Sequence, residues 1–99
     1  MSEFDIRKEE TETGGRYVVT VDGYEAEMTF SKAGATRIII DHTGVPRELG
    51  GRGVGLALVE RGVLDARAAG IKIIPLCPYA KAQIEKHPEW QDVLAGGLK

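Results

Sequence analysis

The 99-residue chain contains a single cysteine, Cys77, which excludes an internal disulfide and any metal site built from several cysteines. It contains no apolar run that approaches the roughly 20 residues of a membrane-spanning helix. The first ten residues include no apolar signal segment, so we expect no export and a cytoplasmic location. A chain of this length forms one modest core, and we predict a single domain over residues 1–99.

The chain also lacks an excess of basic residues, because its formal net charge is −2. General nucleic-acid-binding proteins are usually basic, so this balance argues against nucleic acid as a partner. The charge is unevenly distributed, with a net −4 over residues 1–48 and a net +2 over residues 49–99. The second half of the chain is therefore the better candidate for binding a small anion.

The first half of the chain has the alternating pattern of β-strands. Two strand-like segments flank Asp22-Gly23, and the second alternates apolar and polar side chains, which together predict a β-hairpin. The run Ile38 to Ile40 predicts a central strand that is buried on both faces. The predicted strands span residues 4–10, 16–21, 24–30 and 36–43.

The second half of the chain changes to helical periodicity. Apolar residues recur at helical spacing from Leu58 to Ala66, and Gly70 is a natural end for this helix. The later predicted elements are a buried strand at residues 71–76, a helix at residues 79–87 and a last turn at residues 89–94. The order β-β-β-β-α-β-α predicts an α+β fold, in which an antiparallel meander leads into one βαβ crossover.

Four glycines, Gly50, Gly51, Gly53 and Gly55, fall within six residues directly before the predicted long helix. The first amides of a helix have no intrahelical acceptor and lie at the positive end of the helix dipole. Glycines at this place let a phosphate approach the backbone, so the segment predicts an anion-binding site. A turn that the glycines close for structural reasons alone is the alternative.

Spacing distinguishes three phosphate-binding motifs. The P-loop needs Lys directly after its second glycine, but Gly55 is followed by Leu56. The dinucleotide-binding fingerprint, aligned on Gly51 and Gly53, needs a small residue at the position of Leu56, and an upstream antiparallel hairpin does not suit that fold. The acetyl-CoA motif Arg/Gln-x-x-Gly-x-Gly/Ala matches at both glycines, with Gly50 in place of its first residue.

Several short motifs accompany the glycines: HTGVP before them, GRGVG among them, and ARAAG, PLCPY and HPEW after them. Through these motifs the segment from Asp41 to Trp90 resembles the GNAT superfamily of N-acetyltransferases, and more closely a small, minimal subgroup of it. The resemblance implies a largely antiparallel sheet that is splayed open near the strand before the glycine turn. It also implies that the pantetheine arm of acetyl-CoA pairs with that strand and that the pyrophosphate lies on the turn.

Two groups of residues are expected to bind acetyl-CoA. Pro46 cannot donate a ladder hydrogen bond, so strand pairing ends there and the strand edge before it is free for an amide-bearing ligand. The amides of the glycine turn are expected to bind the pyrophosphate, and Arg52 to add charge at the rim. The predicted cofactor-binding residues are Thr43, Val45, Gly50, Gly51, Arg52, Gly53, Val54, Gly55 and Leu56.

Three side chains are candidates for chemistry at the thioester. Cys77 is a thiol acid or an acetyl-accepting nucleophile, with a space-filling buried cysteine as the alternative. Tyr79 is a proton donor for the leaving sulfur or a packing residue. His42 is a base for the amine or a hydrogen-bonding residue of the turn. The spacing of His42, Cys77 and His87 predicts no metal site.

The leading prediction is an acetyl-CoA-dependent N-acetyltransferase with an amine acceptor that the sequence does not specify. The resemblance implies helices between the early strands that enclose the acceptor, but tight turns leave no room for them here. We therefore expect an open, shallow acceptor side that suits a protein or peptide amine, or a loosely held small amine. A non-catalytic acyl-CoA-binding module on the same fold is the first alternative. An interaction domain whose glycines only close a turn is the second.

Overall fold

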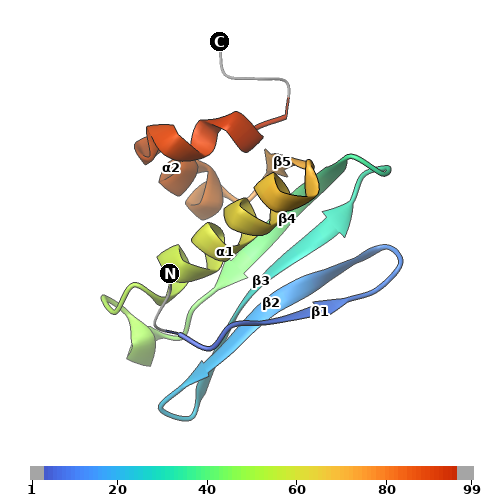
Figure 1. Ribbon diagram of the computed structural model, residues 1–99. Helices are drawn as coiled ribbons and strands as arrows, with labels where there is room; N and C mark the ends of the chain where they lie inside the picture. Colours follow the sequence, from blue (N-terminus) through green and yellow to red (C-terminus); the bar gives the residue numbers. More distant parts are fainter. Residues whose placement is uncertain (1–3, 96–99) are drawn as a thin grey trace.

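The computed structural model describes residues 4–95, in which five strands form one sheet in the order β1-β2-β3-β4-β5 (Figure 1). The strands are β1 (Arg7–Glu10), β2 (Gly14–Val21), β3 (Tyr24–Lys32), β4 (Arg37–Gly44) and β5 (Lys72–Pro75). The helices are α1 (Val54–Ala69) and α2 (Pro78–Lys86), with short 3₁₀ helices η1 (Arg47–Leu49) and η2 (Pro88–Val93). This order confirms the predicted α+β succession. The ends of the predicted domain, residues 1–3 and 96–99, lie outside the described residues.

Three of the four strand pairs are antiparallel, and only β4 and β5 run parallel, so the prediction of a largely antiparallel sheet is also confirmed. The β2–β3 hairpin turns through Asp22 and Gly23, whose φ angles are 51° and 82°. Two successive positive φ angles match the twist of the flanking strands, which is why Asp-Gly is favoured at such turns. The hairpin then pairs without interruption from Val21 and Tyr24 to Gly14 and Ser31.

The helix α1 packs along one face of the sheet, and α2 and η2 lie on the same side of it (Figure 1). The predicted apolar stripe of α1 is buried, and Leu58 and Val63 are fully inaccessible to solvent. A Cβ atom on Gly62 would lie 2.9 Å from Cε of Met28, so this glycine lets the helix approach β3 closely. The helix ends at Gly70 in a left-handed conformation, as predicted.

The isoleucine run in β4 is buried on one face only. Ile38 and Ile40 belong to the core, whereas Ile39 is only half-buried. The prediction of burial on both faces is wrong for Ile39 because this residue pairs with Ser31 on the face of the sheet opposite α1. The described helices cover only the face that packs against α1.

Several element boundaries differ from the predicted ones by a few residues. The first strand begins at Arg7 rather than residue 4, and β5 is two residues shorter than predicted. The helix α2 begins one residue earlier than predicted, at Pro78. Proline is tolerated at this position because the amide that it lacks would have no intrahelical acceptor in the first turn. Among residues 4–95, no helix is both long and apolar enough to cross a membrane.

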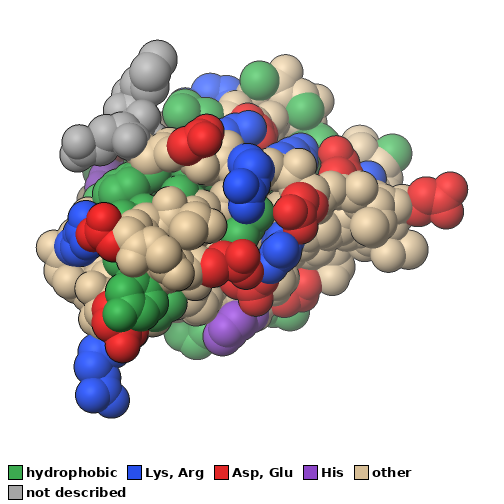
Figure 2. All heavy atoms as spheres, turned by 90° about the horizontal axis from the view of Figure 1, so that it is seen from below, with side chains coloured by type: hydrophobic (Ala, Val, Ile, Leu, Met, Phe, Trp, Pro, Cys, Tyr) green, Lys and Arg blue, Asp and Glu red, His purple; other side chains and the backbone are tan. Residues whose placement is uncertain are grey.

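The sheet face opposite α1 carries charged side chains of both signs. Arg16 on β2 binds Glu9, Glu25 and Glu27, with N–O distances of 2.7, 3.1 and 2.7 Å. The hydrogen bond that Arg16 donates to Glu9, followed by those that it donates to the other two carboxylates, raises the pKa of the guanidinium. The face of the molecule shown in Figure 2 likewise carries both acidic and basic side chains, so it has no large patch of a single charge sign.

Candidate functional site

The strands β4 and β5 separate half-way along β4. Their pairing runs from Arg37 and Lys72 to Ile40 and Pro75, and the amide of Cys77 donates one further hydrogen bond to the Ile40 carbonyl at 3.0 Å. Beyond this point, no described strand pairs with the β5-facing edge of β4. At this splayed part of the sheet the backbone edge of β4 is open to a ligand, and the amide of Thr43 lies against the sulfur of Cys77.

A β-bulge in β4 determines which side chains face this opening. In the pairing with β3, Thr29 is opposite His42 and Phe30 is opposite Ile40, so Asp41 is an extra residue. Side chains alternate between the two faces of a strand, and one extra residue exchanges the faces of everything that follows it. As a result Thr43 points to the face of α1, whereas His42 points to the opposite face.

The glycine loop before α1 has a conformation that needs glycine at two positions. Gly51 and Gly53 both have φ angles of 77°, in the left-handed region that other residues rarely adopt. A Cβ atom at either position would meet nothing within 4 Å, so neither glycine is required by packing. The loop therefore exposes bare backbone over an open space at the start of the helix.

The amides of this loop are available to a ligand. Within residues 4–95, the amides from Gly51 to Leu56 make no hydrogen bond of good geometry to other backbone groups. Gly53 is the N-cap of α1, no side chain caps the helix, and its first turn contains no acidic residue. The positive end of the helix dipole thus faces the open space without a carboxylate of the protein to neutralise it.

A cavity of about 440 Å³ lies between this loop and the free edge of β4. The residues that line it are Thr43, Val45, Leu49, Gly50, Gly51, Gly53, Val54, Gly55 and Tyr79. Seven of these are among the nine predicted cofactor-binding residues, and Tyr79 is a predicted catalytic residue. Leu49 was missed, although an apolar residue between Glu48 and two glycines was a signal that it is anchored in the core.

Two predicted cofactor-binding residues do not line the cavity. The guanidinium of Arg52 hydrogen-bonds the Asp22 carboxylate in the β2–β3 turn, with an Nη1–Oδ2 distance of 2.6 Å. Leu56 is half-buried and packs against the core, so only its backbone amide remains for a ligand. Arg52 is more than one-third exposed, so it sits at the rim of the site rather than inside it.

Gly55 leaves room for a neighbouring side chain as well as for any ligand. A Cβ atom at this position would lie 2.8 Å from Oη and 3.0 Å from Cζ of Tyr79. The interpretation that this glycine makes room for a phosphate is therefore incomplete, because the nearest group is the phenol of Tyr79. The sequence gives no signal for this contact, which joins the first turns of two different helices.

Cys77 is buried at the N-terminus of α2, and its thiol donates to Oγ1 of Thr43 at 3.5 Å. Burial raises the pKa of the Cys77 thiol, but the Thr43 hydroxyl and the backbone amides of Tyr79, Ala80 and Thr43 more than offset this effect. The net pKa lies below that of an ordinary thiol, as is usual for cysteines at helix N-termini.

The pKa of Tyr79 shifts in the opposite direction from that of Cys77. Partial burial, and secondarily the negative charge of the Cys77 thiolate, raise the pKa of the Tyr79 phenol. Tyr79 therefore stays protonated at neutral pH and can donate a hydrogen bond, while Cys77 is the group that ionises more readily. Titratable neighbours with pKa values pushed apart are characteristic of sites that separate a nucleophile from a proton or hydrogen-bond donor.

His42 lies on the face of the sheet opposite Cys77, and its side chain is exposed. Its imidazole packs over Gly44, where a Cβ atom would be 3.2 Å from Nε2. The structure therefore brings Cys77, Thr43 and Tyr79 together but keeps His42 apart from them. A shallow hollow on the side of His42 is lined by Arg16, Glu25, Glu27, Gly44, Val45 and Pro46.

A family model described as GCN5-related N-acetyl-transferase matches residues 16–93. The chain belongs to the GCN5-related N-acetyltransferase family. The NMR structure of a GCN5-like protein from Staphylococcus aureus is 39% identical in sequence and superposes with a TM-score of 0.75. The match covers 100% of this chain and 94% of the other. No curated protein matches the chain significantly.

GCN5-related N-acetyltransferases generally use acetyl-CoA as the acyl donor, and the residues present here fit that molecule. The diphosphate is an anion, and the unpaired amides of the glycine loop suit it. The pantetheine arm contains amides, and the unpaired edge of β4 near Thr43 offers backbone groups to pair with them. The structure thus agrees with the family assignment at both polar parts of the molecule.

Proposed function

We propose that this protein is an N-acetyltransferase that transfers the acetyl group of acetyl-CoA to an amine. The observation that carries the proposal is the glycine loop, whose unpaired amides lie beside the free edge of β4. In the proposed complex, the amides from Gly51 to Leu56 bind the diphosphate and the edge from Thr43 to Val45 binds the pantetheine arm. This arrangement directs the thioester towards Cys77, which is in contact with Thr43.

The position of Cys77 against Thr43 at the β4 edge, together with its lowered pKa and the raised pKa of Tyr79, supports a two-step transfer. The Cys77 thiolate attacks the thioester carbonyl, a carbon–sulfur bond to Cys77 forms, and CoA leaves as a thiolate. The Tyr79 hydroxyl donates a hydrogen bond to the leaving sulfur, and a backbone amide at the β4 edge stabilises the oxyanion. The acetyl group then resides on Cys77.

The second step needs a neutral amine, and the position of His42 indicates the side from which it comes. His42 accepts the excess proton of the incoming ammonium group on that side. The neutral amine then attacks the carbonyl of acetyl-Cys77, the thiolate leaves, and the proton released in this step goes to solvent water. Because His42 lies on the uncovered sheet face, the acceptor approaches from that face, at the end of β4 that does not pair with β5. The hollow beside Gly44 is shallow and open, which suits a peptide or protein amine.

The direct test is turnover with acetyl-CoA and a panel of polyamines, amino acids and lysine-containing peptides, measured as CoA thiol released. We expect thiol release above the hydrolysis background with at least one acceptor class. Calorimetry with acetyl-CoA separates the alternatives. Binding without turnover supports the non-catalytic module, which the family assignment does not favour, and no binding supports a purely structural glycine turn.

Replacing Gly53 with alanine should weaken acetyl-CoA binding by about tenfold or more, because the added methyl group enters the space over the loop amides and weakens a charge-assisted hydrogen bond. The matched control is Gly34→Ala. Gly34 has the same φ of 77° and equally open surroundings, but it lies in the turn between β3 and β4.

Both variants place alanine in a left-handed conformation, so each should lose about 1–2 kcal/mol of unfolding free energy. Calorimetry gives the affinities, and urea unfolding gives the stabilities. Only the Gly53 variant should bind acetyl-CoA more weakly. Equal affinities in the two variants would show that the loop does not contact the diphosphate.

Replacing Gly55 with alanine should separate stability from activity. Alanine is a better helix former than glycine by about 1 kcal/mol, so the melting temperature should hold or rise. The new methyl group displaces the Tyr79 ring, so we expect kcat to fall by about tenfold, and we expect a similar fall in Tyr79→Phe. An unchanged kcat in Gly55→Ala would remove Tyr79 from the mechanism.

A further inference from the structure

A second cavity, of about 260 Å³, lies at the opposite end of α1 from the glycine loop. It is bounded by the C-terminal half of this helix and by the ends of β1 to β4 nearest to it. Eleven residues of helix separate Val54 from Asp65 in its wall, which corresponds to about 16 Å. The cavity is therefore distinct from the proposed acetyl-CoA site.

The walls of this cavity are mainly apolar. The rings of Tyr17 and Phe30 lie side by side, with their centroids 5.5 Å apart, and Ile38, Ala66 and Ile71 are among the other apolar lining residues. A cavity of about 150 Å³ in another protein holds benzene, so the space here is sufficient for one aromatic ring or a short branched chain. The walls thus favour a ligand with a compact apolar body.

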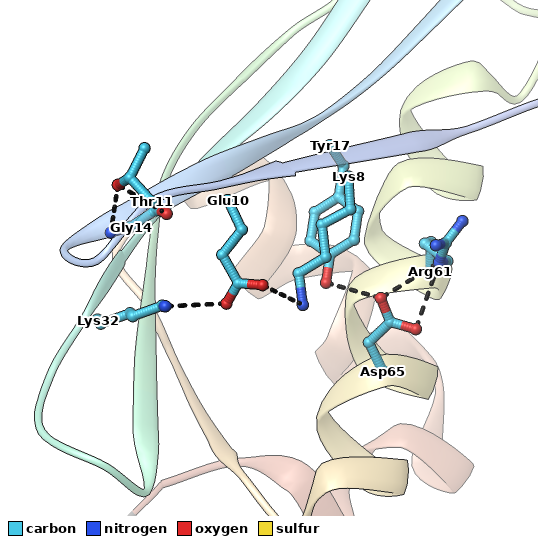
Figure 3. Close-up of polar contacts among 8 residues, drawn as sticks. All are labelled: Lys8, Glu10, Thr11, Gly14, Tyr17, Lys32, Arg61 and Asp65. Carbon is cyan, nitrogen blue, oxygen red and sulfur yellow. Dashed lines mark hydrogen bonds and ion pairs between the residues drawn. The ribbon is translucent and has the colours of Figure 1, made fainter.

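Cationic side chains gather at one side of the cavity. Lys8 and Lys32 share the carboxylate of Glu10, with N–O distances of 3.8 and 2.9 Å (Figure 3). The Lys8 ammonium also lies 5.6 Å from the ring centroid of Tyr17 and 5.7 Å from that of Phe30. Two ammonium groups therefore already converge on one carboxylate directly beside the aromatic wall.

The charged side chains that line the cavity differ in whether they have hydrogen-bond or ion-pair partners. The Asp65 carboxylate accepts hydrogen bonds from the Tyr17 hydroxyl at 2.9 Å and from Nε of Arg61 at 3.2 Å (Figure 3). Arg37 also lines the cavity, yet its side chain forms no ion pair or hydrogen bond with other residues in the range 4–95. Both carboxylates are engaged, whereas one cation is free.

We propose that this cavity binds a small organic monocarboxylate with a compact aromatic or branched apolar body. The apolar body lies against Tyr17 and Phe30, and the carboxylate takes the position between the lysines that Glu10 now holds, with Arg37 adding charge. Glu10 is half-exposed on an edge strand, so it competes with the ligand for the two lysines. The proposal does not depend on acetyl-transfer activity.

The test is a titration of the ¹⁵N-labelled full chain with phenylacetate, followed by ¹H–¹⁵N NMR. We expect saturable shifts of amides around the cavity, such as those of Ile38 and Ala66. Phenylacetamide, which has nearly the same shape without the charge, should bind at least about threefold more weakly. Equal responses to the two probes, or no saturable shift at these amides, would overturn the proposal.

Variants at the cationic side sharpen the test. Glu10→Gln frees both lysines and should tighten phenylacetate binding about two- to fivefold, whereas Arg37→Gln should weaken it by a similar factor. The matched control Glu12→Gln changes an exposed carboxylate of the neighbouring turn and should have no effect. Unchanged or weaker binding in Glu10→Gln contradicts the competition. Acetyl-CoA should shift the glycine-loop amides instead, so the two sites are judged separately.

Discussion

Replacing Cys77 with alanine should lower kcat/KM for acetyl transfer by at least about 100-fold. The thiol contacts Thr43 at the splayed edge of β4, and its pKa is lowered, which favours the thiolate that the proposed attack needs. The affinity for acetyl-CoA should change little, because the proposed binding groups are backbone amides of the loop. Steady-state kinetics and calorimetry on the same preparation measure both quantities.

Two further measurements make the role of Cys77 specific. Incubation with acetyl-CoA alone should add one acetyl group to the wild type and none to Cys77→Ala, as seen by intact mass spectrometry. The rate should rise with pH through an inflection below that of an ordinary thiol, because the thiolate reacts. Thr43→Val removes the favourable hydrogen bond, so it should move this inflection upwards. Full activity in Cys77→Ala would leave the cysteine a packing residue.

Replacing Leu58 with alanine should lower the free energy of unfolding by about 2–5 kcal/mol. Leu58 is fully buried between α1 and the sheet, and its truncation leaves a cavity that the closely packed core cannot fill. A domain of this size has a total stability of about 5–15 kcal/mol, so the loss is a large fraction of it. Urea unfolding followed by circular dichroism measures the change.

Leu64→Ala is the matched control, because it makes the same substitution on the same helix at a side chain that is 43% exposed. Its cost should be within about 0.5 kcal/mol, since a largely exposed leucine loses little buried surface. Similar losses in the two variants would contradict the packing of α1 through its predicted apolar stripe.

The parts of the fold that local patterns determine could be predicted from the sequence. Asp22-Gly23 needs two positive φ angles, and the stripe from Leu58 to Ala66 needs a helix, so both elements follow from short-range rules. Burial depends on what covers each face of the sheet, and this is not written in a strand's own residues. Ile39 was therefore assigned to the core, although no described helix covers its face.

In the candidate site, too, the features that depend on local sequence could be predicted and those that depend on tertiary packing could not. The glycine loop is local, and its residues were recognised because they adjoin a helix N-terminus. The contact of Gly55 with Tyr79 joins two helices that only tertiary packing brings together, so no spacing rule reveals it. Arg52 looked like a ligand because of its place in the motif, but a carboxylate in a distant turn holds its guanidinium.

The extra residue in β4 has a consequence for how this protein tolerates change. The Asp41 side chain is exposed and accepts a hydrogen bond from Ser31 at 2.7 Å, so exchanging it for another polar residue disturbs little. Deleting Asp41 would instead exchange the two faces for all later residues of the strand. The Thr43 hydroxyl would then point away from the Cys77 sulfur, and the His42 imidazole would point towards α1. The placement of Thr43 and His42 on opposite sides of the sheet therefore depends on the number of residues at this point more than on their identity.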